Sequence, residues 1–293
     1  MNQEQSHNNL QEVALPYSKE FLAFLKADLK LGKKYVVLDI HTHNAQISHL
    51  LFQQVHLLCS LSPNASYAQF LQNKYRQRPN FISIHTSPSS TPIEDDSIDC
   101  IFIDETFRSF DNQKLKQEFE RILRLNSYVL ITKHEYLNRS ENFSRAYARW
   151  IEDVLIPETE ANDLSTTELK EFYSNGFKQQ FFQHQKSFSL EELLSYTQFV
   201  FSKNSINWTT QHKDSLQKIF QQFSKKNKII LEYKTVVYFG LFNYSVPEIS
   251  LRKSIFFNIL RPFAFGFYVL VKSNIYLWKA LYKIKDKLFG KKS

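Results

Sequence analysis

An aspartate and two histidines stand at alternate positions after an apolar run near the start of the chain. The sequence YVVLDIHTHNA contains Asp39, His41 and His43, with His49 and His56 close by. Two imidazoles at this spacing could be presented to a metal ion, but a His-x-His loop without cysteine or a placed third ligand is a weak motif. We expect no metal here, and histidines with a structural role are the stronger interpretation. The aspartate could contact a ligand or cap the next helix, and the sequence leaves both open.

Two further ionisable pairs each follow an apolar run. They are Asp104-Glu105 and His134-Glu135. Ligands of open α/β sheets bind at the carboxyl ends of strands, so the acidic pair could face a ligand and His134 could act as a general base. A solvated acidic pair and a structural histidine are favoured, because no Ser-His-Asp, P-loop, Cys-x-x-Cys or paired-carboxylate pattern accompanies them.

Apolar runs alternate with amphipathic segments through the first half of the chain. The expected strands are 35–40, 55–61, 81–84, 98–103 and 128–132, and the expected helices are 17–30, 45–54, 64–76 and 112–125. Strict alternation of this kind predicts a parallel, doubly wound α/β sheet. Beyond residue 135 we expect helices at 140–155, 166–173, 189–196 and 209–223, a strand at 177–185, and a strand or hairpin at 228–242 interrupted near Lys234.

Composition narrows the class of protein. The chain has 293 residues, of which 43% are hydrophobic and 15% aromatic, enough for a substantial core. Its two cysteines, Cys59 and Cys100, lie inside apolar runs, which indicates buried free thiols in a reducing compartment. Residues 1–9 lack the basic start and apolar core of a secretory signal, so we expect a cytoplasmic location.

The stretch IDCIFIDETFRSFDNQKLKQEFERILRLNSYVLIT and the strand–Asp–turn order before it resemble class I S-adenosylmethionine-dependent methyltransferases. The family pattern E-x-x-R-V-L-x-P-G-G is matched by Glu118, Arg121, Ile122 and Leu123, with Leu125-Asn126-Ser127 in place of Pro-Gly-Gly. The loop STPIEDDSID resembles the family's segment before the fourth strand, and the closing IILEYKTVVYFGLF is similar to the trans-aconitate/ubiquinone-type branch. The resemblance implies a Rossmann-like sheet with helical insertions over residues 1–243.

The resemblance also implies where the cofactor would lie. The family carries glycine at the positions of His41, His43 and Ala45, which lets the backbone pass under the methionine part of the cofactor. An acid at the end of the second strand binds both ribose hydroxyls, and this chain has Ser62, or alternatively Ser60, at that place. One hydroxyl cannot replace a carboxylate that accepts two charge-assisted bonds. These replacements predict that S-adenosylmethionine, the family's cofactor, binds with little affinity or none.

The basic character of the chain is confined to its last segment. Residues 251–293 contain ten Lys and Arg and one acid, a net charge of +9, which leaves 27 basic and 28 acidic residues, a net charge of −1, for the rest. A neutral body argues against a nucleic-acid-binding core.

The C-terminal region 244–293 has the pattern of a basic amphipathic helix. Lys272, Lys279, Lys283 and Lys287 share one arc of the helical wheel, five leucine and isoleucine residues lie opposite, and Trp278 is among the flanking aromatics. The uncharged run FAFGFYVLV is far shorter than the roughly 20 residues of a membrane span. We expect this tail to lie on an anionic membrane surface rather than on nucleic acid. A helix that binds a partner or folds back on the domain is the alternative.

Three hypotheses follow from the sequence. The first is a non-catalytic methyltransferase-like subunit, held to an active partner methyltransferase in a hetero-oligomer or held peripherally to the membrane. The second is an active methyltransferase with a divergent cofactor turn that acts on a hydrophobic or lipid-like molecule, for which the aromatic-rich second half could form a pocket. The third is a membrane-recruitment or scaffold module.

Overall fold

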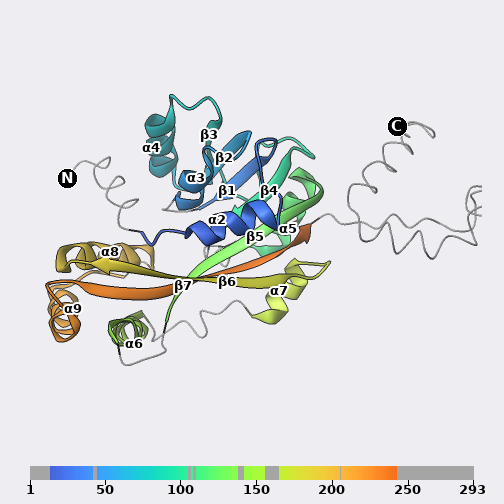
Figure 1. Cartoon of the computed structure of the whole chain (residues 1–293). Coiled ribbons are helices and arrows are strands. Elements are labelled where there is room, and N and C mark those ends of the chain that lie inside the picture. Colours follow the sequence, from blue (N-terminus) through green and yellow to red (C-terminus); the bar gives the residue numbers. More distant parts are fainter. Residues whose placement is uncertain are drawn as a thin grey trace, which may run out of the picture. The chain divides into compact units, whose positions relative to one another are not determined.

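The computed structural model describes residues 14–41, 45–104, 107, 110–137, 142–155, 165–204 and 206–242. A seven-stranded sheet in the order β3-β2-β1-β4-β5-β7-β6 forms its centre (Figure 1). The strands are β1 (Val36–Ile40), β2 (Leu57–Ser62), β3 (Phe81–His85), β4 (Ile98–Ile103), β5 (Leu123–Tyr136), β6 (Lys178–Phe188) and β7 (Ile229–Phe242). The helices are α2 (Lys19–Ala27), α3 (Gln46–Leu51), α4 (Ala65–Tyr75), α5 (Asn112–Ile122), α6 (Phe143–Leu155), α7 (Thr166–Phe172), α8 (Leu190–Lys203) and α9 (Thr210–Phe223).

The predicted Rossmann-like sheet is confirmed, with one strand reversed. Strands β1 to β5 pair in parallel, while β7 is antiparallel to both of its neighbours, β5 and β6. The expected break near Lys234 is wrong, because β7 is one continuous strand. Its register places Lys234 opposite Glu135 of β5, and the two side chains form an ion pair at 2.7 Å. The opposite charge of Glu135 therefore allows a lysine within the strand, although the local sequence pattern predicts an interruption at Lys234.

Two elements extend further than predicted. Helix α8 continues to Lys203 because Phe199 and Phe201, beyond the expected end at residue 196, are both buried. Strand β5 runs for 14 residues, since its second half pairs with β7 as far as Tyr136.

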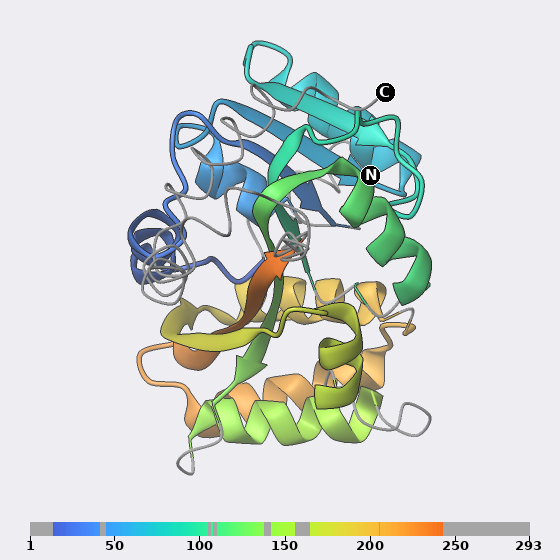
Figure 2. The same cartoon turned by 90° about the vertical axis from the view of Figure 1, so that its right-hand side faces the viewer.

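Apolar residues of the sheet and helices form three clusters. One covers the face of the sheet packed against α5 and α7, and a second covers the opposite face, under α2, α3 and α4. A third joins α6, α8 and α9 to the ends of β5 and β6 and the start of β7, and these three helices lie below α3 and α4 in Figure 2. Cys59 and Cys100 are buried free thiols in this frame, as predicted, and burial raises the pKa of Cys59 to about 11.

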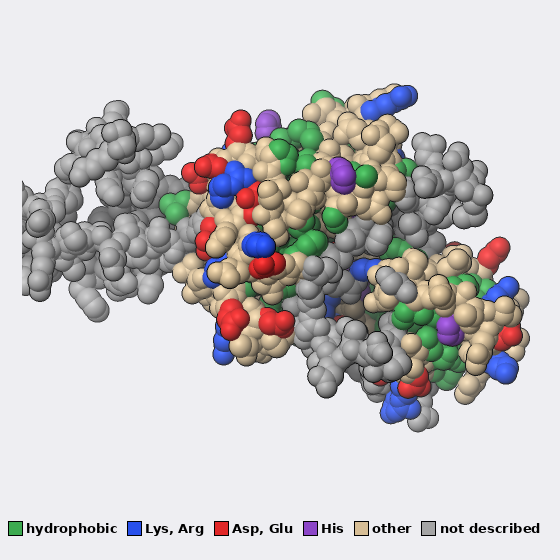
Figure 3. Space-filling model, turned by 180° about the vertical axis from the view of Figure 1, so that it is seen from behind, with side chains coloured by type: hydrophobic (Ala, Val, Ile, Leu, Met, Phe, Trp, Pro, Cys, Tyr) green, Lys and Arg blue, Asp and Glu red, His purple; other side chains and the backbone are tan. Residues whose placement is uncertain are grey.

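The surface of the described part is polar and mixed in charge. Acidic and basic side chains lie side by side over the face opposite to that of Figure 1 (Figure 3). Within the described ranges no helix is long and apolar enough to cross a membrane. The tail residues expected to bind a membrane, Lys272, Trp278, Lys279, Lys283 and Lys287, lie outside these ranges.

Candidate cofactor site

A buried side chain follows β1 in the position of the family's first glycine. In the parallel pairing of β1 with β2, Asp39 stands opposite Ser60, so that both side chains and that of His41 point to the same face of the sheet. His41 Nε2 lies 2.7 Å from Ser60 Oγ, within hydrogen-bond distance. His41 is 1% exposed and Ser60 is fully buried. The imidazole therefore fills the space between the two strand ends.

Helix α4 holds the turn from the other side. The Tyr67 ring meets the His41 ring edge to face, with centroids 5.5 Å apart. The Tyr67 hydroxyl accepts a hydrogen bond of 3.1 Å from the backbone N–H of Ala45. A fully buried tyrosine thus contacts two of the three family glycine positions, and its hydroxyl satisfies a backbone donor that would otherwise be buried without a partner.

Asp39 is bound to the first turn of α3. Its Oδ2 accepts hydrogen bonds from the Ser48 backbone N–H at 2.8 Å and from Ser48 Oγ at 2.6 Å. Ala45, at the N-cap position of α3, provides no side-chain cap, and Asp39 supplies one instead. Of the two possibilities left open by the sequence, the helix cap is the one that these contacts form. Burial raises the pKa of Asp39 to about 7, although the bonds from Ser48 act in the opposite direction.

The other residues expected at the cofactor turn are placed as follows. Ser62 is buried, and its Oγ accepts a bond of 3.2 Å from the N–H of Asn64, the N-cap residue of α4. His43 lies outside the described residues. The sequence alternatives at the end of β2 therefore differ in role, since Ser60 contacts the turn and Ser62 helps to begin α4.

Comparisons with known proteins agree with this fold. Residues 23–131 match the family model of a methyltransferase domain. The match spans 109 of the 293 residues and supports a methyltransferase-like fold for this part of the chain. No curated protein is significantly similar to it in sequence.

Three solved structures superpose on most of the domain. The YcgJ protein of Bacillus subtilis is 15% identical, with a TM-score of 0.50, and the match covers 78% of this chain and 100% of that one. A candidate methyltransferase of Bacillus halodurans is 14% identical, with a TM-score of 0.50 and coverage of 77% and 100%. A candidate type II methyltransferase of Anaeromyxobacter dehalogenans is 10% identical, with a TM-score of 0.52 and coverage of 78% and 98%. At these identities the likeness shows the fold alone.

The residues present at the turn do not fit S-adenosylmethionine in the way that the family binds it. The family's ribose-binding carboxylate is replaced by serine whether Ser60 or Ser62 takes its place, and Ser60 is fully buried against His41. The first glycine position carries an imidazole, and the retained Asp39 is bonded to α3. At the end of β2 both candidates are serines, so neither offers the ribose a carboxylate.

The second pair of candidate residues is engaged within the sheet. His134 Nδ1 lies 3.1 Å from Thr235 Oγ1. Glu135 contacts Lys133 Nζ at 2.5 Å and Lys234 Nζ at 2.7 Å. Burial acts to raise the pKa of Glu135, but the bonds from the two lysines outweigh it and lower that pKa. These contacts favour the structural interpretation of His134 over a general base.

Asp104, the first residue of the acidic pair after β4, lies beside the end of β1. The backbone N–H of Asp104 donates to Ile40 O at 3.4 Å, and its charge adds to the raised pKa of Asp39. Glu105 is outside the described residues. Among the described side chains, no three His, Cys, Asp or Glu residues are grouped as metal ligands.

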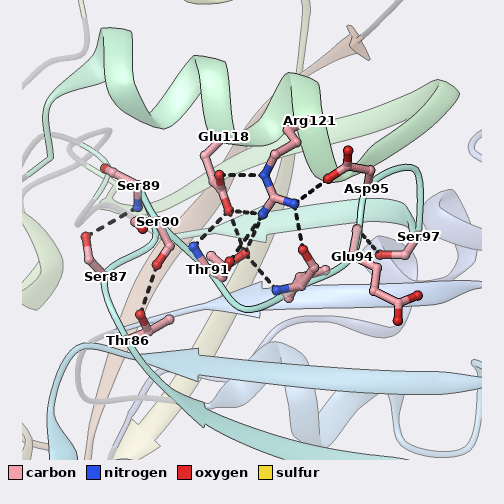
Figure 4. A network of polar contacts seen from close by, with 11 residues as sticks. Thr86, Ser87, Ser89, Ser90, Thr91, Glu94, Asp95, Ser97, Glu118 and Arg121 are labelled. Atoms are coloured by element: carbon pink, nitrogen blue, oxygen red, sulfur yellow. Dashed lines mark hydrogen bonds and ion pairs between the residues drawn. The ribbon is translucent and has the colours of Figure 1, made fainter.

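The family's Glu-x-x-Arg motif has a structural role that the sequence alone does not reveal. Glu118 Oε1 accepts hydrogen bonds from Thr91 N–H at 2.8 Å and from Thr91 Oγ1 at 2.6 Å (Figure 4). Arg121 binds Glu118 and Asp95 at 2.6 Å each, and it donates to the Ile93 carbonyl at 2.8 Å. The motif thus fixes the loop between β3 and β4 onto α5.

Proposed function

We propose that this chain is a methyltransferase-like protein that does not use the family's cofactor and acts as a structural or regulatory subunit. The observation that carries the proposal is the hydrogen bond between His41 and Ser60, both buried. Losing the ribose contacts at roughly 1–3 kcal/mol each removes useful affinity, and a cofactor would in addition have to displace a packed imidazole.

The partner of such a subunit is an active methyltransferase, a membrane surface, or both. A class I domain with a closed site can still present its surface to a related domain. The tail at 244–293 is proposed to hold the chain at an anionic membrane, because its lysines and its apolar residues segregate to opposite sides of a helix. Both roles need the fold, and neither needs an open cofactor turn.

Calorimetry with S-adenosylmethionine tests the proposal directly. We expect no binding heat from the purified chain at cofactor concentrations that saturate ordinary methyltransferases. The matched experiment uses the variant His41→Gly/Ser60→Asp, which restores a glycine and a carboxylate at the two positions in contact. Gain of binding by this variant, with none in wild type, is the expected result.

Micromolar binding by the wild-type chain would overturn the proposal. That outcome favours the second candidate, an active enzyme with a divergent cofactor turn and a hydrophobic or lipid-like acceptor. The retained carboxylate of Asp39, the one member of the family's cofactor set still present, is what speaks for this candidate. A variant that stays folded without gaining affinity would show that His41 and Ser60 are not what closes the site. Co-purification with a second methyltransferase-like protein tests the subunit role separately.

A further inference from the structure

Basic side chains collect at the edge of the sheet where the parallel strands begin. The segment between α2 and β1 contains Lys30, Lys33 and Lys34, and the end of α4 with the segment before β3 contains Lys74, Arg76 and Arg78. All six are exposed. Because parallel strands share one starting edge, the two segments lie on the same side of the molecule. We name these six residues the amino-edge cluster.

The last described residue lies at the same edge. Strand β7 is antiparallel to β5, and its end, Phe242, pairs with Ser127 near the start of β5. Figure 2 looks onto this edge, with the tip of β7 toward the viewer. At about 4.8 Å between strands, β7 is roughly 15 Å from β1 and roughly 24 Å from β3 in the sheet order. The chain thus leaves the described domain beside the cluster, with the 51 residues 243–293 still to follow.

Packing holds several of these cations at the surface. The Arg78 guanidinium lies 4.7 Å from the centre of the Phe52 ring, and Lys74 Nζ lies 5.3 Å from that of Phe70. Lys30 Nζ donates to the Ala27 carbonyl at the end of α2. These contacts hold the charged groups on the rings and at the helix end, and all three side chains remain exposed.

Few acids offset the cluster on its own face. Asp28 is the carboxylate within the segment that precedes β1. Further acids share the edge near β4. Arg121 binds Asp95, and Arg124 binds Asp99, whose Oδ2 also accepts a bond of 2.8 Å from the Val36 N–H. Glu94 and Asp96 are exposed there. The α2 and α4 face therefore presents a net positive charge where the basic tail departs.

We propose that the amino edge of the sheet faces an anionic membrane and binds it through the amino-edge cluster. This inference rests on the tail's membrane role in the proposed function and adds the orientation of the domain. An anionic membrane is the proposed partner because its charge is opposite to that of the cluster. The described domain also ends at this edge, with Phe242, before the basic tail. Basic residues held near an anionic leaflet are attracted additively and over about one Debye length, so the six cations of the cluster would act together on such a surface.

The test is co-sedimentation of the full chain with phosphatidylcholine vesicles that contain or lack phosphatidylserine. The edge variant is Lys33→Gln/Lys34→Gln/Arg76→Gln/Arg78→Gln. The control variant, Lys213→Gln/Lys218→Gln/Lys225→Gln/Lys228→Gln, removes the same charge from α9 and the turn before β7, at the far end of that strand, where the lysines are also exposed. We expect the edge variant to lose about tenfold or more in partition onto phosphatidylserine vesicles and the control about twofold or less. The difference should shrink as salt is raised.

Equal losses in the two variants would overturn the inference and leave the tail as the sole anchor. Wild type that ignores phosphatidylserine would overturn the membrane proposal as a whole, while the calorimetric test of the closed cofactor site stands apart from both. An edge variant that keeps vesicle binding but loses retention on an RNA column would assign the cluster to nucleic acid instead. Circular dichroism identical to wild type confirms that each variant is folded, as expected for exposed positions.

Discussion

Replacing His41 by alanine should lower the free energy of unfolding of this protein. The family has glycine at this position, which has no side chain to contribute to that free energy. The substitution removes a buried ring that packs against Tyr67 and leaves the buried hydroxyl of Ser60 without its imidazole partner. If the imidazole is part of the core, unfolding of the variant must become easier.

The magnitude follows from the two contacts. Large-to-small substitutions at buried sites cost about 2–5 kcal/mol, and the polar imidazole places this one in the lower half of that range. Loss of a partner for a buried hydroxyl contributes about 1 kcal/mol or more. We therefore expect a loss of roughly 2–4 kcal/mol. Ser60→Ala alone should cost about 1 kcal/mol, and the double variant should show a coupling energy of about 1 kcal/mol, because the two side chains share one hydrogen bond.

Urea denaturation of the full chain, followed by circular dichroism, measures these free energies. The matched control is His49→Ala, since His49 is an exposed histidine on α3 in the same region, and it should change stability by about 0.5 kcal/mol or less. A loss in His41→Ala no larger than in His49→Ala would refute the view that the imidazole closes the site. Independent effects of His41 and Ser60 in the double variant would refute their contact.

Two further predictions concern the frame around the site. Gly240→Ala should destabilise the fold by about 1–3 kcal/mol, because the added Cβ would lie 2.6 Å from the Gly176 carbonyl oxygen; Gly32→Ala, whose Cβ would meet an atom at 3.8 Å, is the control, and equal denaturation midpoints would contradict this. Asp39→Asn tests the raised pKa of Asp39. The native carboxyl holds its proton to about pH 7 but the unfolded one only to its ordinary value of 3.8, so its contribution is fully present below pH 4 and is lost as pH rises to about 7. The stability of wild type relative to Asp39→Asn should therefore fall across this interval in denaturation curves at several pH values, and a constant difference would contradict the assignment.

The sequence predicts the order of elements well where each element has a strong local pattern. Strand β4 occurs at 98–103 as predicted, since a run of apolar residues there is bounded by acids on both sides. The extent of β5 and the continuity of β7 could not be predicted, because both depend on pairing between segments about 100 residues apart. A lysine in β7 interrupts the local pattern, whereas in the sheet it meets Glu135.

At the site, residue identities could be predicted but their contacts could not. The missing glycines and the missing acid are visible in the chain. That the replacing His41 reaches the replacing Ser60 depends on the register between β1 and β2, which no local pattern fixes. The role of Tyr67 could not be predicted either, since in the sequence it is one of several aromatic residues on an amphipathic helix.

The Glu-x-x-Arg motif of the family is retained in this chain, whereas most of the family's cofactor positions are replaced. Glu118 and Arg121 still hold the loop before β4 through bonds within the protein, and this function is independent of any ligand. The positions that the resemblance assigns to the cofactor have partners within the protein, since His41 lies within hydrogen-bond distance of Ser60 and Asp39 accepts a bond from Ser48 of α3. These bonds stabilise the end of β1 and the start of α3, and under the proposed function a cofactor would have to compete with the bond between His41 and Ser60.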